Sequence, residues 1–175
     1  AMALFEYVGE YNKSTSWLLR LTKQWHGKEH RTVVADAAFA QVRAAAALHL
    51  EGGLHLIGNI KVCNKYFPQK ALREETPAYQ RNRLICMTKK GTANTGPFAD
   101  APLTLYATGW RCTGNMVCTY IHTRGCTTTG SDRIKRKYTQ MSSGNITSRS
   151  YHAKRPKVSS EYQERMGAID NHNWR

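Results

Sequence analysis

The sequence predicts an α/β fold in which a mixed sheet carries flanking helices and a β-rich insertion. The first indication is a pair of short apolar runs at residues 32–35 and 54–62, separated by an alanine-rich helical stretch at 38–50. The second is a change of texture after residue 84, where strand-like runs alternate with Gly, Pro, Thr and Asn, as is typical of antiparallel strands. Because 175 residues can bury one ordinary core, we expect a single domain.

The N-terminal segment is predicted to be helical. Residues 4–11 have apolar side chains at helical spacing. A second helix is predicted over about 15–24, with Ser14 as its N-cap. The buried face of this second helix is predicted to hold Trp17, Leu18 and Leu21.

The next three elements form a strand-helix-strand unit. Residues 32–35 read as a short buried strand, residues 38–50 as a helix closed by Gly52-Gly53, and residues 54–62 as a second strand. Such a unit implies a parallel strand pair with a right-handed crossover. Asp36 then lies at the carboxyl end of the first strand, at a sheet rim where ligands commonly bind.

The rest of the chain is predicted from local composition. A short helix is expected at 68–75 and an exposed polar loop at 76–83. Strand-like runs are expected at 84–87, 103–107 and 117–122. Residues 127–150 are rich in Thr, Ser, Gly and basic side chains, and they are predicted to be a loop or an irregular strand.

A last helix is predicted near the C-terminus. It begins near Ser159 or Ser160, because Ser160 and Gln163 fit a capping-box pattern. Its buried stripe is predicted to hold Tyr162, Met166 and Ile169.

The charge of the chain is strongly positive and unevenly placed. The formal net charge is +14 and the isoelectric point is near 9.8. Residues 131–157 include eight basic residues and a single acidic residue, Asp132. These predicted DNA-binding residues are Arg133, Lys135, Arg136, Lys137, Arg149, Lys154, Arg155 and Lys157. An excess of this size favours a polyanion such as DNA, bound through its phosphates and largely without sequence preference, although a basic protein can also be basic for other reasons.

Two aspartates lie at the rims of predicted apolar elements, where a carboxylate is costly unless it pairs or binds a cation. One stands in Val33-Val34-Ala35-Asp36-Ala37-Ala38-Phe39, and the other in Tyr162-Gln163-Glu164-Arg165-Met166-Gly167-Ala168-Ile169-Asp170. Together these stretches resemble the second and third acidic positions of the piggyBac-type DDE transposases encoded by transposable elements. The family patterns are Val-x-x-Asp-x-x-Phe and Tyr-Asn-x-x-Met-Gly-Gly-Val-Asp-x-x-Asp. This chain departs from them at Ala37-Ala38, at Gly167-Ala168 and at Asn173, which replaces the last Asp.

The resemblance implies an incomplete RNase H-like domain. It spans nearly the whole of residues 1–175, as a helix-helix-strand-helix-strand unit at 4–62, a variable basic insertion at 63–157 and a C-terminal helix at 158–175. The family's first catalytic aspartate lies on an earlier strand, upstream of the segment that residues 4–40 match. We therefore expect a transposase-derived domain that interacts with DNA and does not cut it.

The resemblance also assigns site residues. Asp36 and Asp170 would be the catalytic and metal-binding remnant of the acidic triad, which in the family holds Mg²⁺ or Mn²⁺ and here would bind such an ion weakly if at all. The residues taken alone favour other roles. Asp36 can cap the following helix, and Asp170 can be a solvated carboxylate that pairs with Arg165 or Arg175.

Three functional hypotheses stay open. The first is the catalytically incomplete DNA-interacting domain, and the second is a fragment of an active DDE transposase that cleaves and transfers DNA strands. The third is a protein-interaction module on the same scaffold. Missing leading strands would leave a sheet edge able to pair with a second copy or another chain.

The remaining composition limits the cellular setting. No apolar run reaches the roughly 18 residues of a membrane helix, so no membrane partner is expected. Five cysteines without tandem close spacing favour a reducing compartment, the nucleus or the cytoplasm. The series Cys112, Cys118, His122 and Cys126 lacks the close knuckles of structural zinc sites, so buried thiols in a β core are the favoured interpretation.

Overall fold

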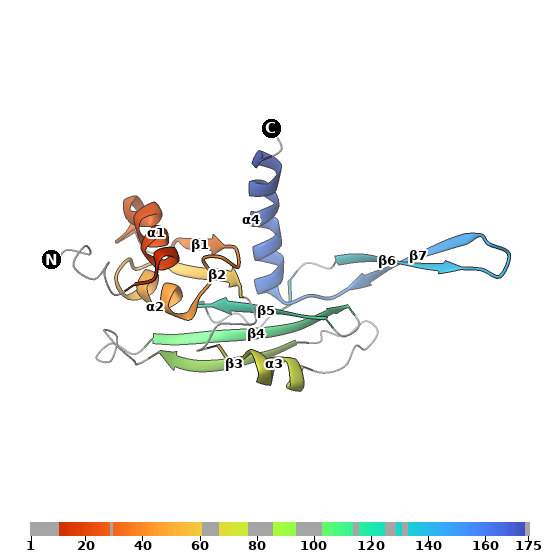
Figure 1. Ribbon diagram of the computed structural model, residues 1–175, viewed down its shortest axis with the longest axis horizontal. Helices are drawn as coiled ribbons and strands as arrows, with labels where there is room; N and C mark the ends of the chain where they lie inside the picture. Colours follow the sequence, from red (N-terminus) through yellow and green to blue (C-terminus); the bar gives the residue numbers. More distant parts are fainter. Residues whose placement is uncertain are drawn as a thin grey trace.

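The computed structural model in Figure 1 describes residues 11–28, 30–60, 67–76, 86–93, 103–113, 116–124, 129–130 and 133–173. Only the backbone is described at 86–93, 103, 112–113, 133, 135–137, 151, 153 and 167–173. Among the described helices, none combines the length and the apolar character that a membrane span requires.

A five-stranded mixed sheet forms the centre of the molecule. Its strands lie in the order β1 (Thr32–Ala35), β2 (His55–Asn59), β5 (Met116–His122), β4 (Leu103–Thr113) and β3 (Cys86–Ala93). β1 and β2 are parallel, and the other three neighbouring pairs are antiparallel. The mixed sheet and its parallel strand pair are therefore confirmed.

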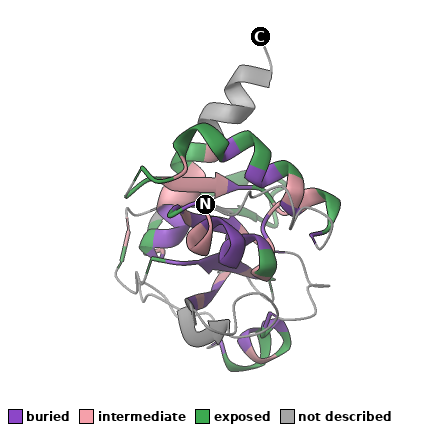
Figure 2. Ribbon diagram, turned by 90° about the vertical axis from the view of Figure 1, so that its left-hand side faces the viewer, coloured by how far each residue is buried: buried purple, intermediate pink, exposed green. Residues whose placement is uncertain are grey.

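Helices cover both faces of this sheet, as expected. Strand alternation sends Leu56 towards the core that contains Leu48 and Leu72, whereas the next residue, Ile57, packs with Val158 on the opposite face. α1 (Lys13–Thr22), α2 (Val42–Leu50) and α3 (Gln69–Glu75) belong to the first face, and α4 (Lys157–Asn173) to the second. The buried residues gather on the strands and the inner helix surfaces in Figure 2.

α1 begins earlier and buries a different face than predicted. Asn12 is its N-cap, because the Asn12 side chain accepts a hydrogen bond from the backbone N–H of Thr15 at 3.0 Å, so the assignment of Ser14 is wrong. Trp17 and Leu21 are 49% and 58% exposed, although Leu18 is buried as predicted. Apolar residues occur on several sides of α1, and only packing against α2 selects Leu18 and Leu19. The helix predicted at 4–11 lies outside the described residues except for Tyr11.

α2, the helix after β1, begins later than predicted, at Val42 and not at residue 38. The carbonyl of Asp36 accepts hydrogen bonds from Phe39 at 3.2 Å and from Ala40 at 2.8 Å, which closes a separate turn first. Gly58 of β2 permits this turn to approach, since a Cβ there would lie 2.4 Å from the Cβ of Ala40. The strand at 32–35 and the helix near 68–75 are confirmed.

Residues 133–153 form a regular hairpin, so the prediction of a loop or irregular strand is wrong. β6 (Arg133–Gln140) and β7 (Ile146–Ala153) pair through eight antiparallel register positions. The turn is closed by the Met141 N–H, which donates to Asn145 O at 2.8 Å, and Gly144 supplies a φ of +81°. Composition misled the prediction because Thr and Ser serve in strands as well as loops. In Figure 1 the hairpin projects away from the sheet.

α4 begins at Lys157, so the capping box predicted at Ser160 and Gln163 is also wrong. The N–H groups of Ser159 and Ser160 both donate to the carbonyl of Pro156, which places these serines inside the first turn. Tyr162 packs against Tyr120, with ring centroids 5.5 Å apart, as the predicted stripe required. Thr76 is buried and not exposed as predicted, while residues 77–83 lie outside the described ranges.

Candidate nucleic-acid interface

Asp36 lies at the carboxyl end of β1, where the sequence placed it. Its side chain is exposed, and Oδ1 accepts a hydrogen bond from the backbone N–H of Ala38 at 2.9 Å. This is the capping contact that the residue alone favoured, but it caps the turn at 37–39 and not α2. One carboxylate oxygen is thereby engaged in local structure.

Asp170 lies in the outer part of α4. The helix meets the sheet through its first turns, where Val158 and Ser159 are buried. At 1.5 Å per residue, Asp170 lies about 16 Å further along the axis than Ser159. Its side chain is outside the description, so the metal-binding role assigned to Asp36 and Asp170 together stays a prediction.

The predicted basic positions concentrate on the β6–β7 hairpin. Residues 133–153 contain five Lys or Arg and no Asp or Glu. The register joins Arg133 with Ala153, Lys135 with Tyr151, and Lys137 with Arg149. Opposed residues in an antiparallel pair share a side of the ribbon, and successive residues alternate. Arg133, Lys135, Lys137 and Arg149 therefore occupy one set of register positions, which we call the basic side.

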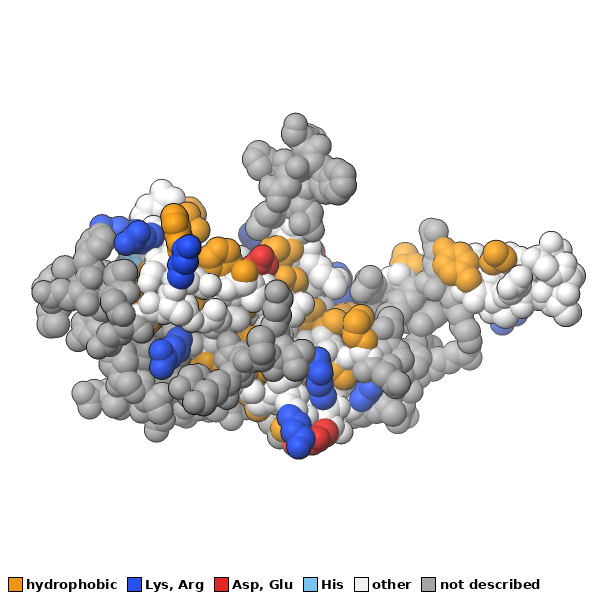
Figure 3. All heavy atoms as spheres, viewed as in Figure 1, with side chains coloured by type: hydrophobic (Ala, Val, Ile, Leu, Met, Phe, Trp, Pro, Cys, Tyr) orange, Lys and Arg blue, Asp and Glu red, His pale blue; other side chains and the backbone are white. Residues whose placement is uncertain are grey.

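The other set of positions holds the apolar residues of the two strands that the structure shows exposed. Ile134, Tyr138 and Ile146 fall on it, and we call it the apolar side. These three side chains are 61%, 63% and 70% exposed. Figure 3 shows apolar side chains gathered on the visible face of the hairpin. Arg136 also falls on this side. The even spacing of Ile134 and Tyr138, which places both on one side of a strand, was visible in the sequence, but the prediction of a loop left it without meaning.

The root of the hairpin is fixed to the start of α4. The N–H of Gly130 donates to the carbonyl of Arg155 at 2.9 Å, and Thr129 forms an antiparallel bridge with Pro156. A Cβ at Gly130 would lie 2.2 Å from Ser160 Oγ and 2.8 Å from Lys157 Cα, so only glycine fits. The two ends of the hairpin therefore leave the domain from one tightly packed point.

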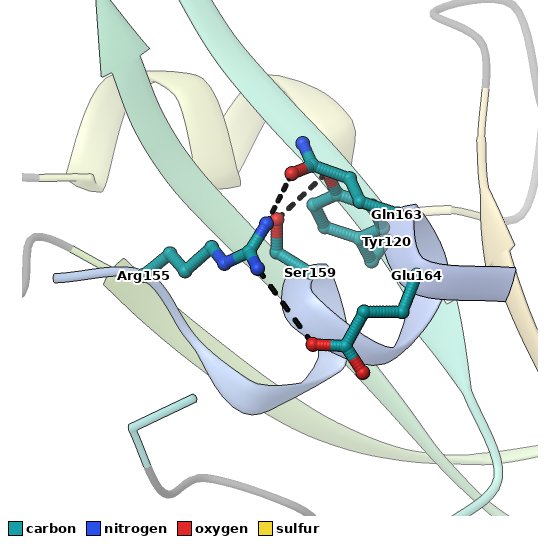
Figure 4. A network of polar contacts seen from close by, with 5 residues as sticks. All are labelled: Tyr120, Arg155, Ser159, Gln163 and Glu164. Carbon is teal, nitrogen blue, oxygen red and sulfur yellow. Dashed lines mark hydrogen bonds and ion pairs between the residues drawn. The ribbon is translucent and has the colours of Figure 1, made fainter. Parts of the chain in front are cut away.

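Arg155 completes this root, as Figure 4 shows. Its guanidinium donates to the side-chain oxygen of Gln163 and lies 3.8 Å from the carboxylate of Glu164. Beneath it, the hydroxyls of Tyr120 and Ser159 are hydrogen-bonded at 3.2 Å. The Arg155 side chain is only 11% exposed. Among the eight predicted DNA-binding residues, Arg155 is thus held by α4, whereas its neighbours Lys154 and Lys157 are exposed.

His122 is the last residue of β5, is buried, and belongs to the structure of the sheet. Its Nδ1–H donates to the carbonyl of Arg124, and its Nε2 accepts from the hydroxyl of Thr108 at 2.9 Å. Burial lowers the pKa of His122 below its ordinary value of 6.5, against the smaller opposing effects of the Arg124 carbonyl and Glu161. Both ring nitrogens are therefore engaged, which leaves His122 without a free lone pair for a metal ion. Cys118 is half-buried and packs against the cluster that contains Ile57 and Val158, while the side chains of Cys112 and Cys126 lie outside the description.

Residues 7–174 match the family model described as Transposase IS4, a model of DDE transposases. The chain belongs to this transposase family. No curated protein and no solved structure matches it significantly. A DDE transposase performs its chemistry with divalent metal ions held by carboxylates. Within the described part of this transposase domain, no group of three or more His, Cys, Asp or Glu side chains is arranged to hold such an ion. The described donors by themselves do not fit a two-metal site.

Proposed function

We propose that this transposase-family domain is of the piggyBac type and interacts with DNA through the β6–β7 hairpin. The observation that carries the proposal is the hairpin itself, which bears five cations and no acid and projects from a fixed root. Phosphates attract such a ribbon without base readout, so binding is expected to depend little on sequence. The exposed side chain of Lys154 extends the same positive surface towards the start of α4, where Lys157 is exposed but pairs with Glu161 at 3.7 Å.

The test is a salt titration of binding to a short duplex DNA. Each phosphate contact contributes about 0.9 to the slope of log affinity against log salt. The combined change Lys135→Gln, Arg136→Gln and Lys137→Gln should therefore reduce the magnitude of the slope by about 2 to 3. A matched control is Lys13→Gln, Arg20→Gln and Lys28→Gln, which removes three exposed cations of α1 and the following turn. An equal effect of both triple variants would place the DNA contact elsewhere, and no binding at low salt would remove the proposal.

We further propose that the chain does not cut DNA by itself. Asp36 is exposed and its Oδ1 is engaged by Ala38, and two carboxylates would supply too few ligands for a two-metal site. A supercoiled-plasmid assay with Mn²⁺ should show no nicking by the wild type, or by the Asp36→Asn and Asp170→Asn variants. Nicking that either change abolishes would instead support the fragment of an active transposase.

A further inference from the structure

The hairpin exposes apolar side chains in a way that phosphate binding does not explain. In the described part of the chain, eight large hydrophobic side chains are exposed, and four of them lie on this hairpin. The four are Ile134, Tyr138, Met141 and Ile146. A two-stranded hairpin has no core of its own and is marginally stable in water, so such side chains gain most when a ligand covers them.

Two of the four lie at the tip. Met141 and Ile146 are 53% and 70% exposed and flank the closing turn, whose N–H of Gly144 donates to the carbonyl of Met141 at 2.9 Å. The residues between them are Ser142, Ser143, Gly144 and Asn145, all small. The tip therefore presents two apolar side chains on a narrow turn.

The cations lie behind this tip. Lys137 and Arg149 are register partners, three residues back along the strands from the pair Gln140 and Ile146. With about 3.4 Å per residue, the charged pair is about 10 Å from the last register pair, Gln140 and Ile146, beside the turn. That separation allows the stem to contact phosphates on the rim of a groove while the tip reaches the base pairs.

The positive charge of the hairpin favours DNA over a second copy of the chain as the ligand that covers its apolar side chains. A second copy would bring another five cations against the first, and its Arg136 would fall on the surface to be buried. Duplex DNA neutralises the cations and offers the tip an apolar contact between base steps. Apart from Asn145, the tip side chains are Met, Ile and Ser, which cannot read base edges with bidentate hydrogen bonds, whereas apolar wedges unstack steps from the minor groove.

We propose that the hairpin enters the minor groove of duplex DNA tip first, and that Met141 and Ile146 wedge against a base step and bend the duplex. This inference rests on the proposed DNA interaction at the same hairpin. The basic side neutralises the neighbouring phosphates, and the deformation favours steps that unstack easily, such as TA. The protein then binds duplexes of different sequence with similar affinity, whereas its preferred position along the DNA is at flexible base steps.

The experiment uses a duplex with a central 2-aminopurine beside a TA step and an energy-transfer pair at its ends. The wild-type chain at saturation should raise the 2-aminopurine fluorescence and the transfer efficiency. The variant Met141→Ser with Ile146→Ser should lose both rises while its salt slope stays that of the wild type. Both side chains are exposed, so the fold tolerates the change. The matched control Trp17→Ser with Leu21→Ser removes an exposed apolar pair from α1 and should retain both rises.

The outcomes separate the two proposals. Salt-dependent binding without a fluorescence or transfer change in the wild type would overturn the wedge and leave the DNA interaction standing. Equal rises in the tip variant and the wild type would also overturn it. Absence of binding at low salt would overturn both proposals. Sedimentation of the wild type as a dimer without DNA, reversed by the tip changes, would identify a second copy as the occupant instead.

Discussion

The contacts of individual charged side chains decide which of them are available to bind a ligand. Asp36 and Arg155 are both charged, and both stood among the predicted site residues. The carboxylate of Asp36 accepts a hydrogen bond from the N–H of Ala38, and the guanidinium of Arg155 contacts Gln163 and Glu164. The charged side chains that are exposed, such as Lys154 and Arg149, are the ones available to a polyanion. Burial and contacts therefore rank residues that the sequence alone treated as equal.

His122 gives a residue-scale prediction about pH. Because burial lowers its pKa in the folded state, the unfolded chain binds more protons than the folded chain below the ordinary value of 6.5. Burial lowers the pKa values of His26 and His55 as well. Stability should thus be full above pH 6.5 and should decline as the pH falls towards the folded-state pKa values. Urea unfolding at pH 7.5 and 5.5 measures the decline.

The contribution of His122 is isolated by comparing variants. His122→Gln should show a smaller difference between the two pH values than the wild type, whatever its absolute stability. His152→Gln changes an exposed histidine and is the control. An undiminished difference in His122→Gln would mean that another group carries the pH dependence.

At the scale of the element, the hairpin is the part that departs most from the sequence prediction. Its pairing rests on eight register positions, on the turn at Gly144 and on a root in which Gly130 and Arg155 contact α4. It shares few contacts with the sheet in the part of the chain that the structure describes. Its direction is therefore set by the root and not by packing along its length.

This arrangement predicts that Arg155 supports the hairpin and contributes little to DNA binding. Arg155→Gln removes the contact with Glu164 and weakens the one with Gln163, which should cost about 1 to 2 kcal/mol of stability. Hydrogen exchange should become faster at the backbone amides near the root. Its exposed neighbour gives the matched control, because Lys154→Gln should leave exchange unchanged and lower the salt slope of DNA binding. A larger loss of slope in Arg155→Gln than in Lys154→Gln would show that Arg155 contacts the phosphates.

At the scale of the whole molecule, the core formed by the mixed sheet and its helices is separate from the positively charged β6–β7 hairpin. The sheet and the four helices hold the hydrophobic clusters, while the strongest concentration of positive charge lies outside them. Among the described strands, β1 stands at one end of the strand order, where the sequence suggested an edge able to pair. Which chain pairs with it stays a prediction. The proposed DNA contact and the hydrophobic clusters therefore involve different residues.

The sequence was sufficient for features that depend on short-range patterns. The strand at 32–35, its parallel partner and the short helix after residue 68 follow from apolar runs, glycines and helical spacing, which are local signals. The family could likewise be approached from two acidic motifs, and the match of residues 7–174 supports the transposase class. The concentration of cations between residues 131 and 157 was also plain in the sequence.

Tertiary structure decided which of several locally equivalent choices was used. Packing against α2 determines which face of α1 is buried. The turn that begins at Asp36 moves the start of the next helix to a later residue. Strand pairing makes a polar stretch into β6 and β7. Strand register then sorted the side chains of that stretch into a basic and an apolar side. Composition gives the same count of cations for a loop and for a ribbon. Only hydrogen-bonded pairing fixes the alternation, because it places successive side chains on opposite sides.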